Sequence, residues 1–374
     1  MLFQILFYAL SGGVLLYYVF FMLRHAIALK RLEPVQKTIS VQGATIIIPV
    51  RNDSIAIRRL LSCLMDQNEV KIPIQIIVVD DHSQDNLRQA IQPYLHKVEY
   101  LLLPEDKQGK KQAIEYGIAH AKHEIIITTD ADCTMQEKWL YSMLSCFENN
   151  TQLVSGPVLL EANTLFQSIQ QIELMGLVGI GAGAIYLNKP NLCNGANLAY
   201  RKTAFHKVKG YEGSLHLASG DDEFLMHKIH HYFACPNAVV FCKNYQSVVF
   251  TPAQTTLRDF LEQRKRWVSK TIHYKRKGLT SQLVIIYLFY WVLLIDILLC
   301  FWKQEFIYFT ILIGLAKIIA EWSIIGQMMY FFKLISIKRI SVFCISQLFQ
   351  VLYVVWAGLV SLRPTFTWKE RKYG

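Results

Sequence analysis

The chain has 374 residues, a formal net charge of +11 and a hydrophobic share of 53%. This length allows two ordinary domains, and the apolar share argues against a disordered or collagen-like chain and for membrane segments. Eight cysteines without a C-x-x-C pair exclude a regular zinc or disulfide framework, and basic residues beside the apolar segments fit anionic lipid headgroups better than nucleic acid.

The first predicted element is an apolar segment over residues 1–23, which contains no charged residue. It is long enough to cross a bilayer as a helix, and Arg24, His25 and Lys30 follow it directly. Basic residues favour the cytoplasmic side, so we expect a membrane anchor with its amino end outside. A cleaved signal peptide is the alternative, but no basic region precedes the segment and no clear small-x-small cleavage site follows it.

Two strands, each followed by an acidic turn, come next. Residues 44–50 form an apolar, β-branched run that predicts a buried strand, and Asp53 lies in the turn after it. Residues 75–79 predict a second buried strand, which ends in Asp80 and Asp81. Apolar residues at helical spacing follow the first of these turns, so the chain is expected to alternate between strands and helices.

A third strand is predicted at residues 100–103, and the polar connection after it carries Lys107 and Lys110. Alternating strands and helices with short connections predict an α/β fold with a doubly wound, mostly parallel sheet, to which the transmembrane helices are added. No G-x-G-x-x-G follows the first strand, and no G-x-x-x-x-G-K-[ST] occurs anywhere in the chain. A dinucleotide-binding fold and a P-loop enzyme are therefore not supported.

The run at residues 125–133 predicts a buried strand that ends in two carboxylates, Asp130 and Asp132. In an extended segment, residues two apart project to the same side, so both carboxylates are expected to face one cation while Ala131 turns away. Carboxylate oxygens suit Mg²⁺ or Mn²⁺, which complete their shell with phosphate oxygens and water. The alternative is a turn in which the Asp side chains make only local hydrogen bonds.

The carboxyl ends of parallel strands meet at one edge of the sheet, where ligands bind. Polar side chains from separate strand ends are therefore expected to converge there: Asp53, Asp80, Asp81, Lys110, Asp130 and Asp132. Carboxylates and cations together indicate a nucleotide diphosphate with its metal ion.

Two later segments add polar groups. Small residues over 193–201 would let a ligand approach the backbone closely, and Asp221 and Asp222 stand at the start of a predicted helix. Helix caps favour acidic residues for structural reasons alone, but an Asp beside a nucleotide site also suits a general base.

Residues 263–267 have the pattern Q-x-x-R-W on a predicted helix, where Gln263, Arg266 and Trp267 share one face. Arg can bind a diphosphate through two hydrogen bonds, and Trp offers a flat surface on which a ligand ring can stack. An amphipathic helix at the membrane surface is the alternative interpretation, and both can hold at once.

These motifs, from about residue 44 to residue 267, resemble the inverting glycosyltransferases of family 2, which have the GT-A fold and use a nucleotide-sugar donor. The resemblance rests on the first strand with Asp53, the V-V-D-D strand end, the D-A-D stretch, the G-D-D segment and Q-x-x-R-W. It implies that Asp53, Asp80 and Asp81 lie around base and ribose, and that Lys107 or Lys110 contacts the pyrophosphate. Asp132 would bind the metal, and Asp130 would bridge ribose and metal.

By the same resemblance, Asp222 would be the general base, with Asp221 as the alternative because G-D-D stands where relatives often have T-E-D. Acceptor contacts would come from the small-residue segment, and diphosphate or acceptor contacts from the Q-x-x-R-W helix. These groups are Asn194, Gly195, Ala196 and Asn197, and Gln263, Arg264, Arg266 and Trp267.

The remaining apolar segments lie mostly near the carboxyl end. Residues 164–187 predict a buried or membrane-grazing helix, whereas residues 281–302, 306–332 and 341–362 are each long enough to cross. Three spans after the anchor would put the terminal Lys369, Arg371 and Lys372 outside, against the charge rule, and the sequence does not resolve this conflict. Lys317 and Glu321, four apart on a helix, are expected to neutralise one another, with lining an acceptor path as the alternative.

The predicted organisation is therefore a transmembrane anchor (residues 1–23), a cytoplasmic GT-A domain (40–255), an interfacial helix with Q-x-x-R-W (256–280) and a transmembrane region (281–374). The expected function is transfer of a sugar from a nucleotide diphosphate sugar, with UDP as the expected nucleotide, to a lipid acceptor at the cytoplasmic leaflet of the inner membrane. The partners expected are the donor, a lipid or glycan acceptor and membrane lipids, without nucleic acid. The alternatives are a processive polysaccharide synthase and a non-catalytic membrane scaffold.

Overall fold

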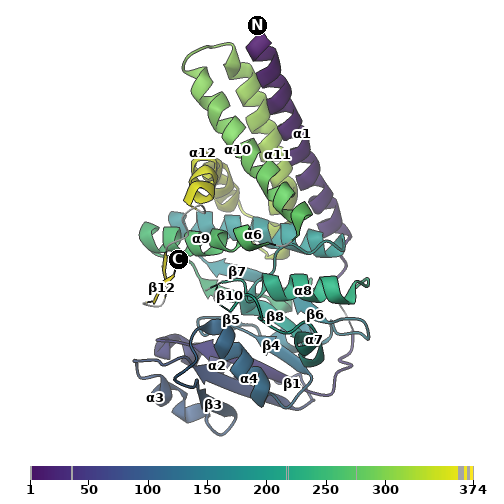
Figure 1. The fold of residues 1–374 in the computed structure, drawn as a ribbon, viewed down its shortest axis with the longest axis vertical. Coiled ribbons are helices and arrows are strands. Elements are labelled where there is room, and N and C mark those ends of the chain that lie inside the picture. The colour runs from purple at the N-terminus through teal and green to yellow at the C-terminus, as the bar shows by residue number, and fades with distance from the viewer. Residues whose placement is uncertain are drawn as a thin grey trace. The chain divides into compact units, whose positions relative to one another are not determined.

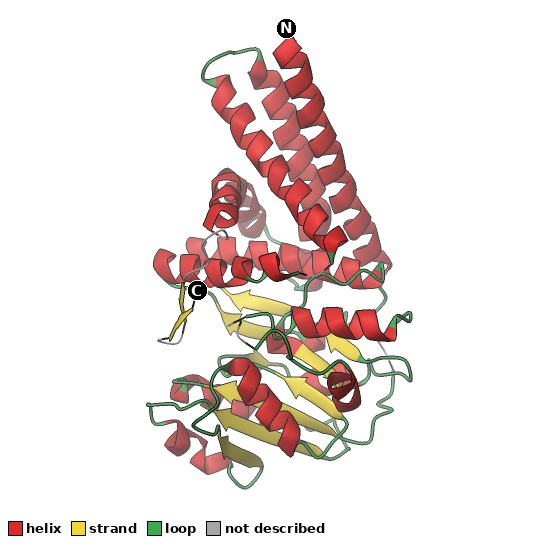
Figure 2. Ribbon diagram, in the orientation of Figure 1, coloured by secondary structure: helices red, strands yellow, loops and turns green. Residues whose placement is uncertain are grey.

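The computed structural model describes residues 2–34, 37–215, 217, 219–274, 276–360, 366–368 and 371–373. The chain divides into two compact units, and each is considered by itself. The α/β unit contains Leu32–Ala162 and Ala184–Ala253. The helical unit contains Met1–Arg31, Asn163–Gly183 and Gln254–Gly374. Figure 1 labels their elements and Figure 2 separates helices from strands.

The α/β unit is built on a seven-stranded sheet with the order β3-β2-β1-β4-β8-β6-β9. Strands β1 to β4 are parallel, whereas β8 runs antiparallel to both β4 and β6. The prediction of an α/β fold with a mostly parallel sheet is confirmed. The strands are β1 (Ala44–Val50), β2 (Ile74–Asp80), β3 (Val98–Leu102), β4 (Ile125–Thr128), β6 (Leu153–Ser155), β8 (Leu198–Arg201) and β9 (Val239–Phe241).

The order of the strands places a switch point at β1. The chain adds β2 and β3 on one side of β1 and then adds β4 on the other side, and ligands bind where such a reversal occurs. In the registers of β1, Val50 pairs with Asp80 of β2, and Ile47 pairs with Thr128 of β4. The turns after β1, β2 and β4 therefore leave the same edge of the sheet.

Six helices accompany this sheet, and α4 contacts β1 and β2 (Figure 1). Gly117 permits this close packing, because a Cβ there would lie 2.7 Å from Cγ2 of Ile47. The first turn of α4 starts at Lys110, at the functional edge of the sheet. The helices are α2 (Ser54–Met65), α3 (Leu87–Ile91), α4 (Lys110–His120), α5 (Trp139–Leu144), α7 (Lys202–Lys207) and α8 (Glu223–Phe233).

The continuous apolar run after residue 153 forms two strands that belong to different sheets. Strand β6 ends at Ser155, and β7 (Val158–Glu161) joins β10 (Val249–Pro252) and β5 (Thr134–Met135) in a three-stranded sheet. The break lies at Gly156 and Pro157, because Gly156 donates its N–H to the carbonyl of Asn197 and proline has no N–H to give.

The helical unit contains α1 (Leu2–Arg31), most of α6 (Leu165–Tyr186), α9 (Leu257–Ser269), α10 (Lys277–Cys300), α11 (Phe306–Phe331) and α12 (Ile337–Val360). Helices α1, α10 and α11 contact one another pairwise and run lengthwise as a bundle (Figure 1). Helix α12 is seen almost end-on in the same view, so it runs across this bundle.

Five helices in the described part of the chain are long and apolar enough to cross a membrane: Phe7–Arg31, Leu165–Tyr186, Lys277–Cys300, Phe306–Phe331 and Ile337–Val360. The predicted anchor and tail segments fall within this set. The most apolar window of α6 is 67% buried within the structure, more than that of the other four, as expected for a buried helix. Met1, Ser361 and Leu362, which belong to predicted spans, lie outside the described residues.

The carboxyl-terminal strand β11 (Phe366–Trp368) contacts α9 and pairs with β12 (Arg371–Tyr373). Helix α12 runs across the bundle in Figure 1 but is also long and apolar enough to cross a membrane, so the structure does not test the side on which Arg371 and Lys372 lie. Lys369 lies outside the described residues.

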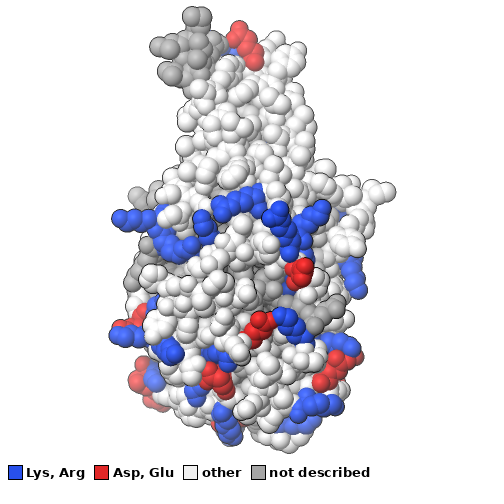
Figure 3. Space-filling view, turned by 90° about the vertical axis from the view of Figure 1, so that its right-hand side faces the viewer, with Lys and Arg blue, Asp and Glu red and all other residues white. Residues whose placement is uncertain are grey.

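Basic residues collect where α1 and α11 end and α10 begins, which is one end of the bundle (Figures 1 and 3). The face of the bundle in Figure 3 shows almost no charge along its length. The residues at these helix ends are Arg24, Lys30, Arg31, Arg276, Lys277, Lys333, Lys338 and Arg339.

A buried polar cluster joins the helices of the bundle to α12. Lys317 Nζ lies 2.9 Å from Glu321 Oε1 and donates to Gln347 and Gln350 of α12, so the predicted Lys317–Glu321 pair is confirmed. Tyr18 of α1 and Tyr290 of α10 donate to the same Glu321 oxygen, at 2.5 and 3.1 Å. All three protons of the Lys317 ammonium therefore have acceptors.

Candidate active site

The two carboxylates after β4 lie in a turn, so the predicted extended geometry is wrong. Strand β4 ends at Thr128, and the N–H of Cys133 donates to the carbonyl of Asp130 over 3.2 Å. Ala131 is buried, whereas Asp130 and Asp132 are partly exposed. A closed turn holds the two side chains at the strand end without the alternation of a strand.

Lys110 links the metal stretch to the later acidic motif. Its Nζ lies 2.7 Å from Asp130 Oδ1 and 3.2 Å from Asp221 Oδ2. Burial alone would lower the pKa of Lys110, but the adjacent Asp130 and Asp221 outweigh burial and raise it. For Asp221, burial alone would raise the pKa, and Lys110 and Lys111 overcome that effect and lower it. The cluster is thus a buried lysine that lies between two carboxylates.

Asp222 caps α8 and also reaches the small-residue segment. Its Oδ1 accepts the N–H of Glu223 at 2.7 Å, and its Oδ2 accepts the N–H of Gly195 at 3.0 Å. A side chain at Gly195 would not fit, because a Cβ there would lie 2.8 Å from Asp221 Oδ2. Asp221 is buried and Asp222 is partly exposed, so Asp222 is the more accessible of the two.

The V-V-D-D strand end shapes the turns around the site. Asp81 Oδ2 accepts the N–H of Gly109, which immediately precedes Lys110, at 3.0 Å. Asp80 accepts the N–H of Ser83 at 2.8 Å and the hydroxyl of Tyr100 at 2.6 Å, and it is 5% exposed. Burial and the bond to Asp80 raise the pKa of Tyr100. Both carboxylates therefore hold backbone and neighbours in position.

Asp53 lies at the N-cap position of α2, partly exposed, in a turn that is fastened to the turn after β2. The N–H of Asn52 donates to Ser83 Oγ at 3.0 Å, and Asn52 Oδ1 accepts the N–H of Gln84 at 2.8 Å. Lys107 is exposed, with its ammonium 5.6 Å from the ring centre of Tyr116. These groups lie on the connections that follow β1, β2 and β3.

In the predicted acceptor segment, the four residues differ in access. Asn194 is partly exposed and its side chain accepts the N–H of Ala196, whereas Gly195 and Ala196 are buried. Asn197 is 0% exposed and has three partners, Trp139 Nε1 and the carbonyls of Pro157 and Ser247. A direct acceptor contact by the Asn197 side chain is therefore not supported, because its hydrogen-bonding groups are used in the core.

The Q-x-x-R-W residues lie on α9 in the helical unit. Arg264 is 1% exposed, pairs with Glu173 of α6 at 2.6 Å and lies over the rings of Phe260 and Trp267. Arg264 thus holds α9 against α6, which contradicts a direct contact with diphosphate or acceptor. Gln263, Arg266 and Trp267 are partly exposed, and their roles stay predictions.

Asp130 and Asp132 fit a hard divalent ion in the manner expected when phosphate supplies the remaining ligands. Within the described residues no group of three His, Cys, Asp or Glu side chains could hold a metal by itself. Mg²⁺ is commonly bound by one or two carboxylates together with water and substrate phosphates. The donor set here corresponds to that arrangement, and Lys110 already places one positive charge against Asp130.

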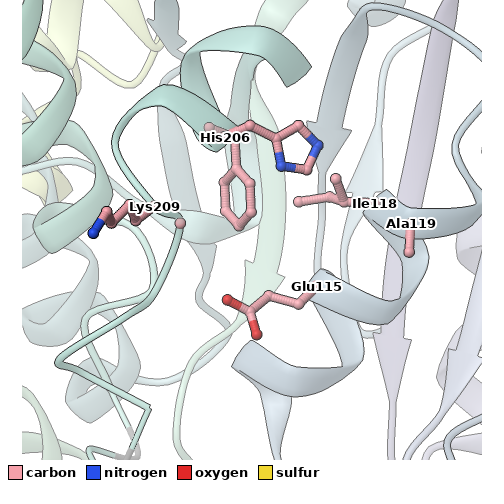
Figure 4. A pocket seen from close by; sticks show the side chains of 7 residues that line it. Glu115, Ile118, Ala119, His206 and Lys209 are labelled. Atoms are coloured by element: carbon pink, nitrogen blue, oxygen red, sulfur yellow. The ribbon is translucent and has the colours of Figure 1, made fainter.

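A small pocket of about 240 Å³ lies elsewhere on the α/β unit, between α4, α7 and the loop that follows α7 (Figure 4). It contains none of the predicted site residues and is therefore not the candidate active site. Its walls are formed by Glu115, Ile118, Ala119, Phe205, His206, Lys209 and Gly210.

Three residues of the site edge were not found from the sequence. Arg51 donates to the carbonyls of Asp81 and His82 at 2.7 and 3.2 Å, and Tyr100 bonds to Asp80. Lys111 bonds to three backbone carbonyls before Asp221. Arg51 follows the first strand directly, which was an available signal, but Tyr100 and Lys111 depend on contacts that no local pattern encodes.

Residues 45–208 match the domain described as glycosyl transferase family 2. This segment includes β2 to β4, β6 and β8, so the larger part of the seven-stranded sheet is similar to that family.

Two curated relatives have polysaccharide synthase names. The chain is 30% identical over 129 residues to a chondroitin synthase of Pasteurella multocida, covering 34% of this chain and 13% of the relative. It is 26% identical over 176 residues to a poly-β-1,6-N-acetyl-D-glucosamine synthase of Staphylococcus aureus, covering 46% and 42%. The chain thus matches less than half the length of each of these relatives.

A solved structure shares the fold over nearly the whole chain. It is a mannosyltransferase from Pyrobaculum calidifontis in complex with GDP-Man and Mn²⁺, with a TM-score of 0.57. The similarity covers 96% of this chain and 97% of that one, at 13% sequence identity. At this identity the likeness supports the fold and not the substrate.

Proposed function

We propose that the protein transfers one sugar, with inversion, from a nucleotide diphosphate sugar to a lipid acceptor at the cytoplasmic leaflet, with a UDP-sugar as donor. The observation that carries this proposal is the cluster of Asp130, Lys110, Asp221 and Asp222 at the edge of the GT-A sheet. It combines carboxylates for a metal ion, a cation for phosphate and a partly exposed acid.

The donor is held by the turns of β1, β2 and β4. Asp53, with the loop fixed by Asp80 and Asp81, receives base and ribose, while Lys110 and Lys107 face the diphosphate. Asp130 and Asp132 would hold a divalent ion, Mg²⁺ or Mn²⁺, which would supply positive charge against the diphosphate when bound. The mannosyltransferase of similar fold was solved with Mn²⁺, in line with this donor set.

Asp222 takes the proton of the acceptor hydroxyl. That oxygen then forms the new bond to the anomeric carbon, and the bond from this carbon to the diphosphate oxygen breaks. Asp222 is favoured over Asp221 because it is partly exposed, whereas Asp221 is buried beside Lys110. Asn194 and the backbone at Gly195 and Ala196 are proposed to contact the acceptor.

Gln263, Arg266 and Trp267 are assigned to the diphosphate and the sugar ring. This assignment rests on the Q-x-x-R-W pattern and on their partial exposure. Arg266 would offset charge on the leaving group, and Trp267 would present a ring face.

A lipid acceptor is favoured by the closed interior of the bundle. The polar groups of Tyr18, Tyr290, Lys317 and Glu321 bond to one another, which leaves no water-lined path for a polymer through this cluster of described residues. Basic helix ends at one end of the bundle favour the cytoplasm there. The α/β unit follows Arg31 directly in the chain, so we place it on the cytoplasmic side.

A processive polysaccharide synthase is the second candidate, favoured by the similarity to the poly-β-1,6-N-acetyl-D-glucosamine synthase. The two differ in product length. A non-catalytic scaffold, the third alternative, predicts no transfer and no effect of changes at Asp222.

The test is incubation of the purified full chain in lipid nanodiscs with labelled nucleotide sugars, Mg²⁺ or Mn²⁺, and lipid extract. We expect a labelled lipid that carries one sugar. Long labelled chains made from donor alone would instead support the synthase, and no turnover with any donor would support the scaffold.

A further inference from the structure

Lys111 is a buried lysine that binds backbone carbonyls just before the acidic motif. It is 4% exposed, and its Nζ donates to the carbonyls of Ser214 at 2.6 Å, Leu217 at 3.0 Å and Ser219 at 2.9 Å. An ammonium group has three protons, so these three acceptors match its donors in number. One positive charge therefore binds three carbonyls of the connection from Ser214 to Ser219.

Lys110 and Lys111 are adjacent at the start of α4 but have different partners. Lys110 pairs with carboxylates of the site, Asp130 and Asp221. Lys111 holds the connection that leads into Asp221 and also lies 5.5 Å from the ring centre of Phe224 in α8. The first turn of α4 therefore contacts Asp221 through Lys110 and the connection before Asp221 through Lys111.

The described residues of the connection that Lys111 contacts, 214, 215, 217 and 219, belong to no strand or helix. The connection runs between two glycines in left-handed conformations, Gly213 at φ +78° and Gly220 at φ +84°. Ser214 and Ser219 are both 6% exposed, so their carbonyls need a donor inside the protein. Loss of the ammonium would remove one donor from each of these carbonyls, although that of Ser214 would still accept the N–H of Leu217 at 3.1 Å. The path into Asp221 would then lose an anchor.

We infer that Lys111 is a positioning residue for the acceptor-activating carboxylate. It sets the place of Asp222 by holding the carbonyls of Ser214, Leu217 and Ser219. This inference rests on the proposed function, because it assigns Lys111 to the step in which Asp222 takes the acceptor proton. Lys111 itself touches neither substrate nor metal in this assignment.

The direct test is Lys111→Met in the full chain in nanodiscs. Displacement of a catalytic group by about 1 Å can cost about 100-fold in rate, and we expect a fall of that order in kcat. The dissociation constant of the donor nucleotide should change by less than about threefold, because the donor turns keep their own hydrogen bonds. Lys111→Arg, which keeps the charge but has a planar head, should recover part of the rate.

A double-mutant cycle separates positioning from general destabilisation. If Lys111 acts through Asp222, then Lys111→Met should lower the residual rate of Asp222→Asn by less than about threefold. Hydrogen exchange supplies a second readout that does not need activity. The amides of Gly220 to Phe224 should exchange faster in Lys111→Met while β1 and β4 keep their protection.

Lys228 provides a matched control. Its Nζ also donates to backbone carbonyls, those of Gly210 at 2.7 Å and Glu212 at 2.9 Å, but these precede the anchored connection. Lys228→Met should leave kcat within about twofold of the wild type, since it removes a similar contact away from Asp222.

The results can show separately whether the role of Lys111 or the proposed sugar transfer is wrong. If the wild type transfers sugar and Asp222→Asn does not, but Lys111→Met keeps the wild-type kcat, the positioning role is wrong and the function stands. Equal losses in Lys111→Met and Lys228→Met, or an undiminished effect of Lys111→Met in Asp222→Asn, also overturn it. If the wild type transfers no sugar, the proposed function itself fails, whereas the exchange measurement still tests the anchor.

Discussion

Two lysine–carboxylate clusters in this protein have similar chemistry and different surroundings. In the α/β unit, Lys110 lies between Asp130 and Asp221, and the Asp130 side chain is 37% exposed. In the helical unit, Lys317 and Glu321 have side chains that are 3% and 6% exposed. The first cluster is open to solvent, and the second is closed by protein.

The difference shows why an ion pair alone does not define a site. In the closed cluster, the three N–H groups of the Lys317 ammonium donate to Glu321, Gln347 and Gln350. These bonds connect α11 to α12. The open cluster keeps partly exposed carboxylate oxygens beside a switch point of the sheet. The exposure of its charged groups therefore distinguishes the candidate binding site from the structural ion pair.

The largest expected effect belongs to the open cluster. Asp222→Asn should lower the transfer rate by about 1,000-fold, because the amide cannot take the acceptor proton. Initial rates with a labelled donor in nanodiscs measure this loss. Asp66→Asn, an exposed carboxylate at the end of α2, should retain the wild-type rate. Comparable activity of Asp222→Asn and wild type would remove Asp222 from the reaction.

The next effect belongs to the closed cluster and concerns stability. Lys317→Met leaves Glu321 buried without its cation, and we expect a loss of about 3 kcal/mol in the free energy of unfolding. Thermal unfolding in nanodiscs measures it. The double change Lys317→Met with Glu321→Gln should lose less, because no lone charge remains. An unchanged unfolding temperature for Lys317→Met would show that Glu321 does not depend on Lys317 for its burial.

Removal of divalent ions should affect the function of the open cluster and leave the stability of the closed cluster unchanged. A chelator is expected to lower the transfer rate by about 100-fold, because Asp130 and Asp132 then lack the ion that neutralises the diphosphate. Added Mg²⁺ or Mn²⁺ should restore it, and unfolding of the helical unit should not respond. Full activity in the chelator would show that the two carboxylates serve another purpose.

The smallest expected effect concerns the hydrogen bond from Tyr100 to Asp80, which lies beside the open cluster. Tyr100→Phe should cost about 1 kcal/mol at pH 7, since Asp80 loses the phenol hydrogen bond. Burial, followed by this bond, raises the pKa of Tyr100. A raised pKa stabilises the folded state below the ordinary value of about 10, and this contribution falls as pH rises further.

Unfolding measured from pH 7 to 11 should therefore show a shallower decline for Tyr100→Phe than for wild type above about pH 10. Tyr94→Phe is the control, because that hydroxyl makes only a 3.4 Å contact with the carbonyl of Arg58. Parallel declines in Tyr100→Phe and wild type would contradict the role assigned to Tyr100.

Much of the α/β fold was predictable because its strands are apolar runs with clear ends. Residues 44–50 form β1 as predicted, and β2 extends the predicted run by one residue at each end. The run over residues 153–161 is divided into β6 and β7 at Gly156, and this division depends on a bond to Asn197, far along the chain. Hydrophobic periodicity and composition indicate which secondary structure a segment prefers, but they cannot identify a hydrogen-bond partner that is distant in the sequence.

The sequence by itself determined which residue types gather at the sheet edge, because parallel strands deliver their ends to one place. Only the tertiary structure decided what each does there. It buried Asn197 and Arg264 in packing, closed the Asp130 turn and placed Lys111 beneath the acidic motif. The reason is physical: a side chain's role depends on access and on the partners that use its hydrogen bonds, and those partners come from distant parts of the chain.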